Sequence, residues 1–548
     1  QMKSHPIGKW KNDGSGASSS VGALKEALYN VTKACFLVEA NGNTAVATDG
    51  KAEIGGNVAE GSPLLAFAPE LPPENLGDSS FLADFDVDYP IVGGAMYHGI
   101  TSVEMVEAMA KAKMLAFFGT GGLPLQKTEE AICRLKEALG DKTFGCNLLH
   151  SPFEPEAEKE TVELFIKHGL RTVSASAYTA LTLPIVRYRL HGIKKLPDGT
   201  VEAPNRVIGK VSRQEVATKF FAPPPENLVK ELVQQGLLTE EQANMAKTIP
   251  VGQDITAEAD SGGHTDNQPF VTMVPTMLAL RDQAQKKYGF KMPLRVGVGG
   301  GIGTPAAAAA SFAMGAAYLV TGSVNQSCVE AGTSRAVREM LAQTQQADVT
   351  MAPAADMFEM GVKVQVLKRG TMFPMRAAKL WELYRSCPSI EAIPEKERAS
   401  LEKSYFKASL DEIWQQTRDY FQQRDPGQVT KAEADSKHKM ALVFRWYLGQ
   451  SSHWATNGEA TRKFDYQIQC GPSMGAFNEW TKGTFLETCE ERRIVPVSLN
   501  LLLGASILTR LQGLRFQGVD LPDEVLAVSP MKPEELARRL NKTIDGLN

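Results

Sequence analysis

Glycine-rich loops at two neighbouring places are the strongest chemical signal in this sequence. From Leu294 to Ser323 the chain reads LRVGVGGGIGTPAAAAASFAMGAAYLVTGS. The pattern predicts a buried strand, a glycine loop, an alanine-rich helix, a second strand and a second loop. Thr304 and Pro305 have the residue types of a helix N-cap and of a first helical position. Because glycine allows close approach and N–H groups at helix N-termini bind anions, the two loops predict a phosphate site.

The same loops have a simpler interpretation, namely tight turns that pack a helix on a sheet. They also differ in context from the G-x-G-x-x-G fingerprint of dinucleotide-binding proteins. The glycines lie in mid-chain after several other predicted strands, and no acidic residue closes a following strand at the expected distance. A mononucleotide phosphate is therefore favoured over a dinucleotide.

His264 lies in a second glycine-containing loop, Ala259–Asp266, which reads ADSGGHTD and directly follows the predicted strand Ile255–Glu258. In a barrel of alternating strands and helices, reactive groups lie at the carboxyl ends of the strands. A histidine there can donate a proton or position a substrate carbonyl near neutral pH. The alternative is a surface-loop histidine that caps a helix.

Two further polar residues lie in predicted strands. Asn147 ends the strand Thr143–Asn147, and its amide could hydrogen-bond the edge of a heterocyclic ring. Lys210 lies in Arg206–Val211, where its cation could stabilise the negative charge of a reduced flavin. The alternative for Lys210 is a salt bridge with an inward carboxylate. Cys146 neighbours Asn147 and is expected to pack on the opposite side of the strand.

Strands that alternate with helices explain how these residues could meet. Eight short apolar runs without strict alternation predict strands that are buried on both faces. Together with the helices between them, they match the length of a (β/α)₈ TIM barrel over residues 89–370. An open doubly wound sheet is the alternative. The predicted strands are Tyr89–Val92, Met114–Phe118, Thr143–Asn147, Leu170–Ser174, Arg206–Val211, Ile255–Glu258, Leu294–Val298 and Tyr318–Val320.

Three regions add to this α/β barrel. Residues 1–88 are predicted to hold a loose tail and a small N-terminal β region with strands at Ala34–Val38 and Thr44–Thr48. The passage at about 180–248 is too long for ordinary barrel loops and contains helix-like pieces. It predicts a lid-like insertion over the barrel mouth, with a surface decoration as the alternative. Residues 371–548 predict an all-α C-terminal extension.

Composition and missing motifs narrow the function classes. The chain has 548 residues and a net charge of −4, which offers no case for nucleic acid as a partner. Seven scattered cysteines indicate reduced thiols and a cytoplasmic protein. Gln1–Ser20 is polar and Pro305–Val324 is mostly Ala and Gly, so we expect no signal peptide and no membrane partner. Because the sequence has no zinc-ligand spacing, G-x-S-x-G or Walker A loop, we expect no metal site.

Several longer strings resemble one family. The sequence is similar to the FMN-dependent nitronate monooxygenase (2-nitropropane dioxygenase) superfamily, and more closely to its PfaD branch. That branch holds the trans-acting enoyl reductases of polyunsaturated-fatty-acid and polyketide synthases. The resemblance runs from about Ala34 to the C-terminus. It rests on GGAM (Gly93–Met96), GCN (Gly145–Asn147), ADSGGHTDNQPF (259–270), GVGGGIGTP (Gly297–Pro305), TGS (Thr321–Ser323), DVTMAPAADMFEMGVKVQVLKRGTMFPMRA (348–377) and MALVFRWYLG (440–449).

The resemblance implies an FMN-bound TIM barrel and assigns its contacts by position. His264 matches the active-site histidine of the superfamily. Asp260 is predicted among the FMN-binding residues. Asp260 and Ser261 stand where the superfamily pattern has Glu and Ala, which leaves the exact contacts of these two residues open. The implied FMN contacts are Gly94, Ala95 and Met96 beneath the isoalloxazine ring, Asn147 and Lys210 at the ring and its polar edge, Gly262 and Gly263 along the ring and ribityl chain, and Gly300, Gly301, Gly322 and Ser323 at the phosphate.

The reaction that the resemblance implies is reduction of a trans-2-enoyl thioester on an acyl carrier protein, with NADPH as the reductant of FMN. His264 would serve as a donor to the developing enolate or to the α-carbon, or would only shape the pocket. The superfamily also suggests a homodimer.

Two other functions stay open. One is a nitronate-oxidising flavin oxygenase that acts on small nitro compounds, and the other is a non-catalytic flavin-binding scaffold within a synthase. An oxygenase for small substrates has no evident need for the insertion and the large helical extension. A carrier-protein substrate could use both as a docking surface, so the enoyl reductase is favoured.

Overall fold

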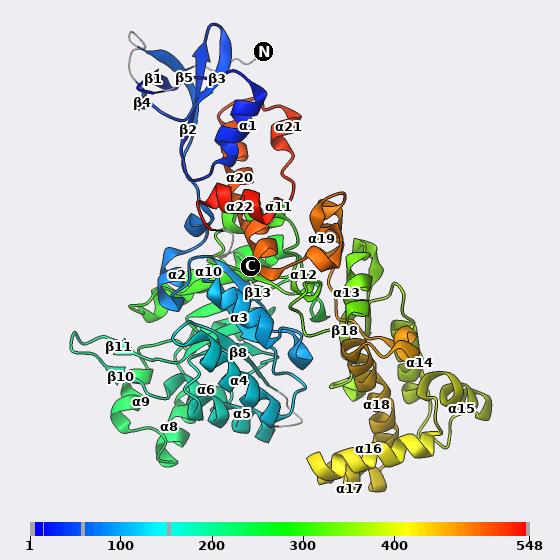
Figure 1. Cartoon of the computed structure of the whole chain (residues 1–548). Helices are drawn as coiled ribbons and strands as arrows, with labels where there is room; N and C mark the ends of the chain where they lie inside the picture. Colours follow the sequence, from blue (N-terminus) through cyan, green and yellow to red (C-terminus); the bar gives the residue numbers. More distant parts are fainter. Residues whose placement is uncertain (1–5, 15, 56–60, 151–154, 544–548) are drawn as a thin grey trace.

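Eight parallel strands close into a barrel at the centre of the computed structural model (Figure 1), which describes residues 6–14, 16–55, 61–150 and 155–543. The strand order around the barrel is β12-β13-β15-β16-β6-β7-β8-β9. This confirms the predicted TIM barrel and excludes the open sheet. Every predicted strand is present, and no boundary moves by more than two residues. The barrel strands are β6 (Ile91–Gly93), β7 (Leu115–Phe118), β8 (Gly145–Leu149), β9 (Thr172–Ser176), β12 (Arg206–Val211), β13 (Asp254–Glu258), β15 (Arg295–Gly299) and β16 (Leu319–Thr321).

Helices between the strands form the outer layer of the barrel (Figure 1). The predicted cap is confirmed, because the Thr304 hydroxyl accepts a hydrogen bond from the Ala307 N–H at 3.2 Å and Pro305 begins the helix. The outer helices are α3 (Val103–Lys111), α4 (Leu125–Leu139), α5 (Pro155–Lys167), α6 (Leu183–Leu190), α7 (Gln214–Phe220), α10 (Phe270–Tyr288), α11 (Pro305–Ala313) and α12 (Ser323–Gln326).

An ionic cluster and a short helix close the amino-terminal end of the barrel. Arg295 and Asp254 begin neighbouring strands, and their side chains are 1% and 2% exposed. They form a bidentate ion pair, with Arg295 Nε and Nη2 at 2.7 and 3.0 Å from the two carboxylate oxygens of Asp254. Helix α2 (Ser79–Phe85) covers the pair, since Asp84 lies 2.8 Å from Arg295 Nη1 and Phe81 stacks on Tyr318 at 4.3 Å. The cluster therefore fills the amino-terminal end of the barrel with paired charges.

A five-stranded antiparallel sheet stands apart from the barrel at the top of Figure 1, and helix α1 (Val21–Tyr29) packs beside it. The two predicted N-terminal strands are confirmed as β2 and β3. Residues 8–11, which composition assigned to a loose tail, instead form strand β1 between β5 and β4. Residues 1–5 of that predicted tail lie outside the described residues. The sheet has the order β3-β2-β5-β1-β4 and consists of β1 (Gly8–Lys11), β2 (Cys35–Ala40), β3 (Asn43–Ala47), β4 (Lys51–Ile54) and β5 (Ser62–Ala68).

The predicted insertion contains the helices α8 (Glu226–Gln234) and α9 (Glu240–Ala246). Its contacts run to helix α6 and to the hairpin of β10 (Lys194–Lys195) and β11 (Val201–Glu202). The two helices belong to the connection that leads from α7 to the amino end of β13. Because barrel sites lie at the carboxyl ends, these contacts favour the surface decoration rather than a cover over the mouth.

The chain after the barrel first returns to the mouth and then becomes helical. Strands β17 (Val349–Pro353) and β18 (Lys363–Leu367) form a small sheet with β14 (Gly263–His264). Phe444 and Tyr447, in the long helix Ser436–Asn457, are fully buried. The predicted helical extension is thereby confirmed. Its helices are α13 (Arg335–Ala342), α14 (Phe373–Ser386), α15 (Glu395–Leu401), α16 (Leu410–Arg424), α17 (Pro426–Ala434), α18 (Ser436–Asn457), α19 (Ser473–Thr481), α20 (Ile494–Phe516), α21 (Asp523–Leu526) and α22 (Pro533–Leu540).

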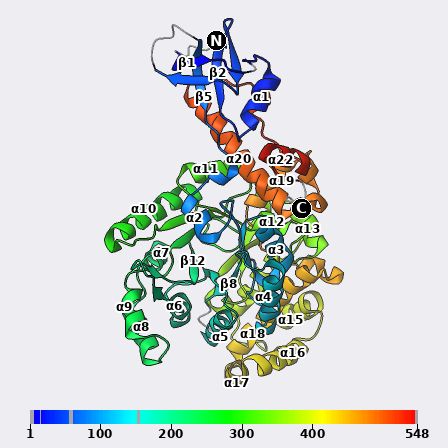
Figure 2. The ribbon, with the colours of Figure 1, turned by 60° about the vertical axis from the view of Figure 1, so that its left-hand side comes forward.

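Helix α20 connects the barrel to the N-terminal sheet (Figure 2). Near the middle of the helix, Gly504 lies so close to Pro305 that a Cβ would come within 2.6 Å of the proline ring. Further along, Arg510 donates to the carbonyl oxygens of Leu28 and Asn30 at 2.9 and 2.7 Å. This helix is long and apolar enough to cross a membrane, but 89% of its apolar window is buried inside the protein. Its hydrophobicity therefore serves the packing between the two parts.

Removing Arg295 should destabilise the barrel. In Arg295→Ala the buried Asp254 carboxylate loses its counter-charge, which costs about 3–5 kcal/mol in comparable buried pairs. We expect a lower unfolding midpoint in urea. Arg335→Ala removes an arginine whose side chain is 70% exposed and should change stability by less than about 0.5 kcal/mol. Equal midpoints for the two variants would contradict the role of the pair.

Candidate functional site

The carboxyl ends of the barrel strands bring every predicted site residue to one face of the barrel. These ends form what we call the mouth, where TIM barrels build their sites from loops of several strands. Gly94, Ala95 and Met96 follow β6, Asn147 lies in β8, Lys210 lies in β12, Asp260, Gly262, Gly263 and His264 follow β13, Gly300 and Gly301 follow β15, and Gly322 and Ser323 follow β16.

The two glycine loops offer unfilled backbone donors. Gly300 has φ +83° and a Cβ on it would lie 2.6 Å from the Ala259 carbonyl oxygen, so only glycine fits. A Cβ on Gly322 would meet nothing within 4 Å. In the described part of the chain, no acceptor pairs with the backbone N–H groups of Gly300, Gly301 and Gly322. Open space beside unpaired donors fits a phosphate group.

A buried threonine holds the loop after β6. Thr101 is fully buried, and its hydroxyl donates to the Gly94 carbonyl at 2.7 Å and accepts from the Met96 N–H at 3.0 Å. The Gly94 N–H in turn donates to the Thr321 carbonyl oxygen at 2.9 Å. These bonds set the course of Gly94–Met96 next to the second glycine loop. Sequence reasoning missed Thr101, because a lone threonine carries no local signal.

Asn147 is a buried amide at the mouth. Its side-chain oxygen accepts a hydrogen bond from the Ser176 hydroxyl at 3.1 Å, and Thr120 donates to its backbone carbonyl at 2.8 Å. Among residues 6–14, 16–55, 61–150 and 155–543, no acceptor pairs with its amide N–H₂ group. The amide is therefore oriented and keeps a donor for a ligand.

Lys210 has the inward carboxylate partner that the alternative interpretation foresaw. Its Nζ lies 2.8 Å from Glu258 Oε1, and the Ser261 hydroxyl donates to the same oxygen at 3.2 Å. The two charged side chains are 30% and 17% exposed, so both reach the mouth while neutralising each other. An ion pair does not exclude a ligand contact, and the predicted contact of Lys210 with a flavin edge stays a prediction.

His264 is paired with an acid from beyond the barrel. Its Nε2 lies 3.2 Å from Oδ1 of Asp356, which stands between β17 and β18. Partial desolvation lowers the pKa of His264, but the hydrogen bond and charge of Asp356 outweigh it and raise that pKa above its ordinary value. Partial desolvation likewise raises the pKa of Asp356, but the hydrogen bond and charge of His264 hold that pKa below its usual range. Each partner therefore favours the charged form of the other, although the two side chains are 42% and 60% exposed.

Asp260 stabilises the loop that carries His264. Its Oδ1 accepts hydrogen bonds from Asn267 at 2.9 Å and from Gln365 of β18 at 2.8 Å. Gln365 also donates to the Ser261 carbonyl oxygen at 2.8 Å. The observed contacts of Asp260 are therefore internal, and its predicted contact with FMN stays untested.

The glycine-containing segment Cys470–Gly475, which follows α18 in the chain, closes the side of the mouth near the two glycine loops. Gly471 N–H donates to the Ser323 hydroxyl at 2.9 Å. A Cβ on Gly262 would lie 2.8 Å from the Cys470 nitrogen, and one on Gly303 would lie 2.2 Å from the Ser473 carbonyl oxygen. Glycine therefore allows three backbone segments to touch where side chains would keep them apart. Sequence analysis assigned no role to this segment.

Two further histidines lie at the mouth and were missed by sequence reasoning. His98 follows β6 and stacks on His453 of α18 with ring centroids 4.4 Å apart. Burial, with a contribution from His453, lowers the pKa of His98 to about 4. His150 follows β8, and its Nδ1 lies 2.8 Å from a carboxylate oxygen of the buried Glu158. Only their places at strand ends, once the barrel was recognised, could have singled them out.

Comparisons with known proteins agree with this architecture. The crystal structure of the enoyl reductase domain of MlnA, from the macrolactin cluster of Bacillus amyloliquefaciens, is 41% identical with a TM-score of 0.77. The match covers 80% of this chain and 99% of that domain. Residues 387–466 match the family model of the inserted helical domain of [acyl-carrier-protein] S-malonyltransferase.

Two curated relatives are longer proteins. A polyunsaturated fatty acid synthase subunit of Thraustochytrium is 47% identical over 448 residues, which make up 80% of this chain and 30% of the relative. Polyketide biosynthesis protein PksE of Bacillus subtilis is 44% identical over 436 residues, which make up 79% of this chain and 56% of the relative. The chain thus spans about a third to a half of these relatives. It belongs to the PfaD-like family of enoyl reductases from polyunsaturated-fatty-acid and polyketide synthases.

Proposed function

We propose that this protein is an FMN-dependent enoyl reductase that uses NADPH to reduce trans-2-enoyl thioesters on acyl carrier protein domains of a polyunsaturated-fatty-acid or polyketide synthase. One observation carries the proposal. Unpaired backbone donors in two glycine loops and the His264–Asp356 pair lie at the same barrel mouth. A phosphate-bearing cofactor and a proton donor would therefore face the same substrate.

Different residues of the mouth would bind different parts of FMN. Gly300, Gly301 and Gly322 would donate their N–H groups to the phosphate, with Ser323 beside them. The Asn147 amide and the Lys210 ammonium would meet the polar edge of the ring, while Gly94–Met96 and Gly262–Gly263 would let the backbone lie flat against it. The chemistry that bound FMN would supply is hydride transfer from the nicotinamide to the β-carbon of the enoyl thioester.

His264 would supply the proton. The Asp356 carboxylate raises the pKa of His264, which would extend the imidazolium form to higher pH than in a free histidine. An imidazolium can hydrogen-bond the thioester oxygen as negative charge develops there, or deliver a proton to the α-carbon. The nitrogen that faces Asp356 is Nε2, so Nδ1 is the atom that would act on the substrate.

The names of the relatives support a carrier protein as the partner, and the cysteines support a reducing compartment. Both curated relatives are named as parts of synthase or polyketide systems, which favours a substrate tethered to a carrier protein. All seven cysteines are unpaired, and six are buried. We propose a cytoplasmic enzyme on this basis, because thiols of this kind are typical of a reducing compartment.

Anaerobic stopped-flow absorbance tests the proposed function. The purified protein is mixed first with NADPH and then with a crotonyl carrier protein. Bleaching of the flavin band followed by its return on adding the thioester is the expected result. Return only when oxygen enters, or bleaching by a nitronate in place of NADPH, would instead support the flavin oxygenase. A flavin that responds to none of these reagents would support the non-catalytic scaffold.

Gly322→Asp should strongly weaken FMN retention. The Cβ position is open, so the side chain fits, but its carboxylate would repel the phosphate. We expect the purified variant to lose at least about 1.4 kcal/mol of FMN binding, a tenfold rise in Kd by fluorescence titration. Gly322→Asn has the same shape without the charge and should retain more FMN. Equal FMN affinity of the two variants would contradict the assignment of the FMN phosphate to this loop.

Asp356→Asn should shift the pH dependence of flavin reoxidation by the enoyl thioester. In the wild type the raised pKa keeps His264 protonated to a pH above its ordinary value of about 6.5. Without the Asp356 charge, the lowering of the His264 pKa by desolvation and Lys210 outweighs its raising by Glu258. The pKa then falls below the ordinary value, so the loss of rate with rising pH should begin at a lower pH than in the wild type. Asp282→Asn changes a carboxylate that is 67% exposed and should leave the profile unchanged. An unshifted profile in Asp356→Asn would remove this pair from proton delivery.

A further inference from the structure

Three exposed apolar side chains gather where the helical extension joins the small sheet of the mouth. Met372 and Met375 lie at the start of α14, which packs on β17, and Phe464 lies in the short helical segment Ala460–Asp465. The Met372 N–H donates to the Phe464 carbonyl oxygen at 2.7 Å, which places the two segments side by side. The three side chains are 38%, 61% and 67% exposed. We call them the apolar patch, and exposed apolar groups that gather in this way mark a contact surface.

Three lysines border the apolar patch. Lys463 and Lys368 stand one and four residues before members of the patch, and both are exposed. Lys407 is also exposed, and its Nζ donates to the Thr461 carbonyl oxygen at 2.7 Å. In the part of the chain that the structure describes, no carboxylate forms an ion pair with these three lysines. Their charges are therefore available to a partner.

Few acidic groups oppose these lysines. Asp465 is buried, and it already pairs with Arg376 and Arg462. Glu459 is exposed and accepts a hydrogen bond from the Thr461 hydroxyl at 2.8 Å. One exposed carboxylate against three lysines leaves the border of the apolar patch with a net positive charge. An acidic partner surface with apolar side chains at its centre would match it.

Strand β18 connects the apolar patch to the reactive loop. Val364 of β18 pairs with His264, and the strand ends three residues later at Leu367, about 10 Å further along. Lys368 follows directly. A partner on the patch would therefore stand beside the mouth, and its substrate would have to reach the mouth on an extended arm.

We propose that the apolar patch and its three lysines form the docking surface for the acyl carrier protein that brings the substrate. This inference rests on the proposed function, because it names where the partner of that function binds. A carrier protein holds its acyl group on a long arm attached through a phosphodiester, so it can dock beside the mouth while the thioester enters. Three apolar side chains make a small contact, which suits a partner that must leave after each turnover.

A second copy of this chain is a less suitable occupant. A two-fold dimer through the apolar patch would bring the same surface of each copy together. Lys463 and Lys368 would then face the lysines of the other copy, and like charges at short distance repel. The positive border therefore favours a partner of a different and acidic kind.

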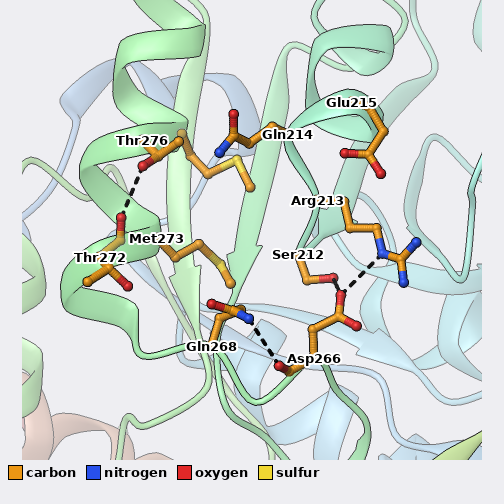
Figure 3. A pocket seen from close by; sticks show the side chains of 10 residues that line it. Ser212, Arg213, Gln214, Glu215, Asp266, Gln268, Thr272, Met273 and Thr276 are labelled. Carbon is orange, nitrogen blue, oxygen red and sulfur yellow. Dashed lines mark hydrogen bonds and ion pairs between the residues drawn. The ribbon is translucent and has the colours of Figure 1, made fainter.

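The side of the mouth near α7 and α10 lacks this positive charge. A cavity of about 610 Å³ lies there between the two helices (Figure 3). Its wall holds the carboxylates of Glu215 and Asp266, and the cation among its lining residues, Arg213, already pairs with Asp266 at 3.4 Å. An acidic carrier protein would meet like charge on that side, so we place the docking surface at the apolar patch.

Binding of the carrier protein tests the docking surface without relying on turnover. Fluorescently labelled crotonyl carrier protein is titrated with the FMN-loaded wild type and with Phe464→Ser and Lys463→Glu, and its anisotropy is followed. Matched controls are Phe516→Ser, whose phenylalanine is 82% exposed at the end of α20, and Lys291→Glu, whose exposed lysine precedes β15 at the opposite end of the barrel. We expect about a tenfold higher Kd in both patch variants and the wild-type Kd in both controls.

A substrate without a carrier separates docking from damage to the mouth. In stopped-flow, the patch variants should need about tenfold more crotonyl carrier protein for half-maximal flavin reoxidation, with an unchanged limiting rate. Crotonyl-CoA has no protein to dock, so it should reoxidise the flavin of the patch variants as it does that of the wild type. An equal loss with both thioesters would overturn the inference.

The remaining outcomes distinguish this inference from the proposed function. Unchanged carrier binding in both patch variants would overturn the docking surface even if the enzyme reduces both thioesters. A wild-type dimer that Phe464→Ser dissociates in sedimentation would assign the apolar patch to a second copy and would also overturn it. If neither thioester reoxidises the wild-type flavin, the proposed function fails, and the anisotropy titration alone then decides whether the carrier protein binds at the patch.

Discussion

A two-residue strand pairing ties the reactive loop of the barrel to the chain that follows it. β14 contains His264, and it pairs with β18, which comes after all eight barrel strands. The same strand carries Gln365, whose amide holds Asp260 and the Ser261 carbonyl oxygen. Ordering a loop of this kind costs conformational entropy, and without the strand pairing few contacts would offset that cost. The position of His264 therefore depends on residues beyond the barrel.

The charged side chains at the mouth come as pairs, and the β14–β18 pairing accounts for one of them. Asp356 reaches His264 because it precedes β18, and Glu258 reaches Lys210 from the neighbouring strand. Pairing lowers the cost of keeping a charged group in a partly desolvated site and shifts its proton affinity. The mouth thus places Lys210 and, when it is protonated, His264 beside carboxylates and carries no large net charge. Such an arrangement suits a reaction in which negative charge develops only briefly.

Backbone contact through glycine joins the extension to the two glycine loops. The segment around Gly471 touches Gly262 and Ser323, and Ser473 touches Gly303. Helix α20 then buries its apolar surface between the barrel and the N-terminal sheet. The extension is therefore part of the architecture of the mouth, which agrees with the MlnA enoyl reductase domain, since that domain matches over 99% of its own length.

The sequence by itself determined the barrel, its strand boundaries, the glycine loops and the family. Apolar runs and glycine positions are local signals that need no knowledge of distant residues, and long strings such as ADSGGHTDNQPF distinguish a family. Only the tertiary structure decided the partners of Lys210 and His264, the strand formed by residues 8–11 and the place of α8 and α9. The physical reason is that these features arise between segments far apart in the chain. Hydrogen bonds and ion pairs of that kind leave no periodicity in either segment, so they exist only once the barrel has closed and the extension has folded back on its mouth.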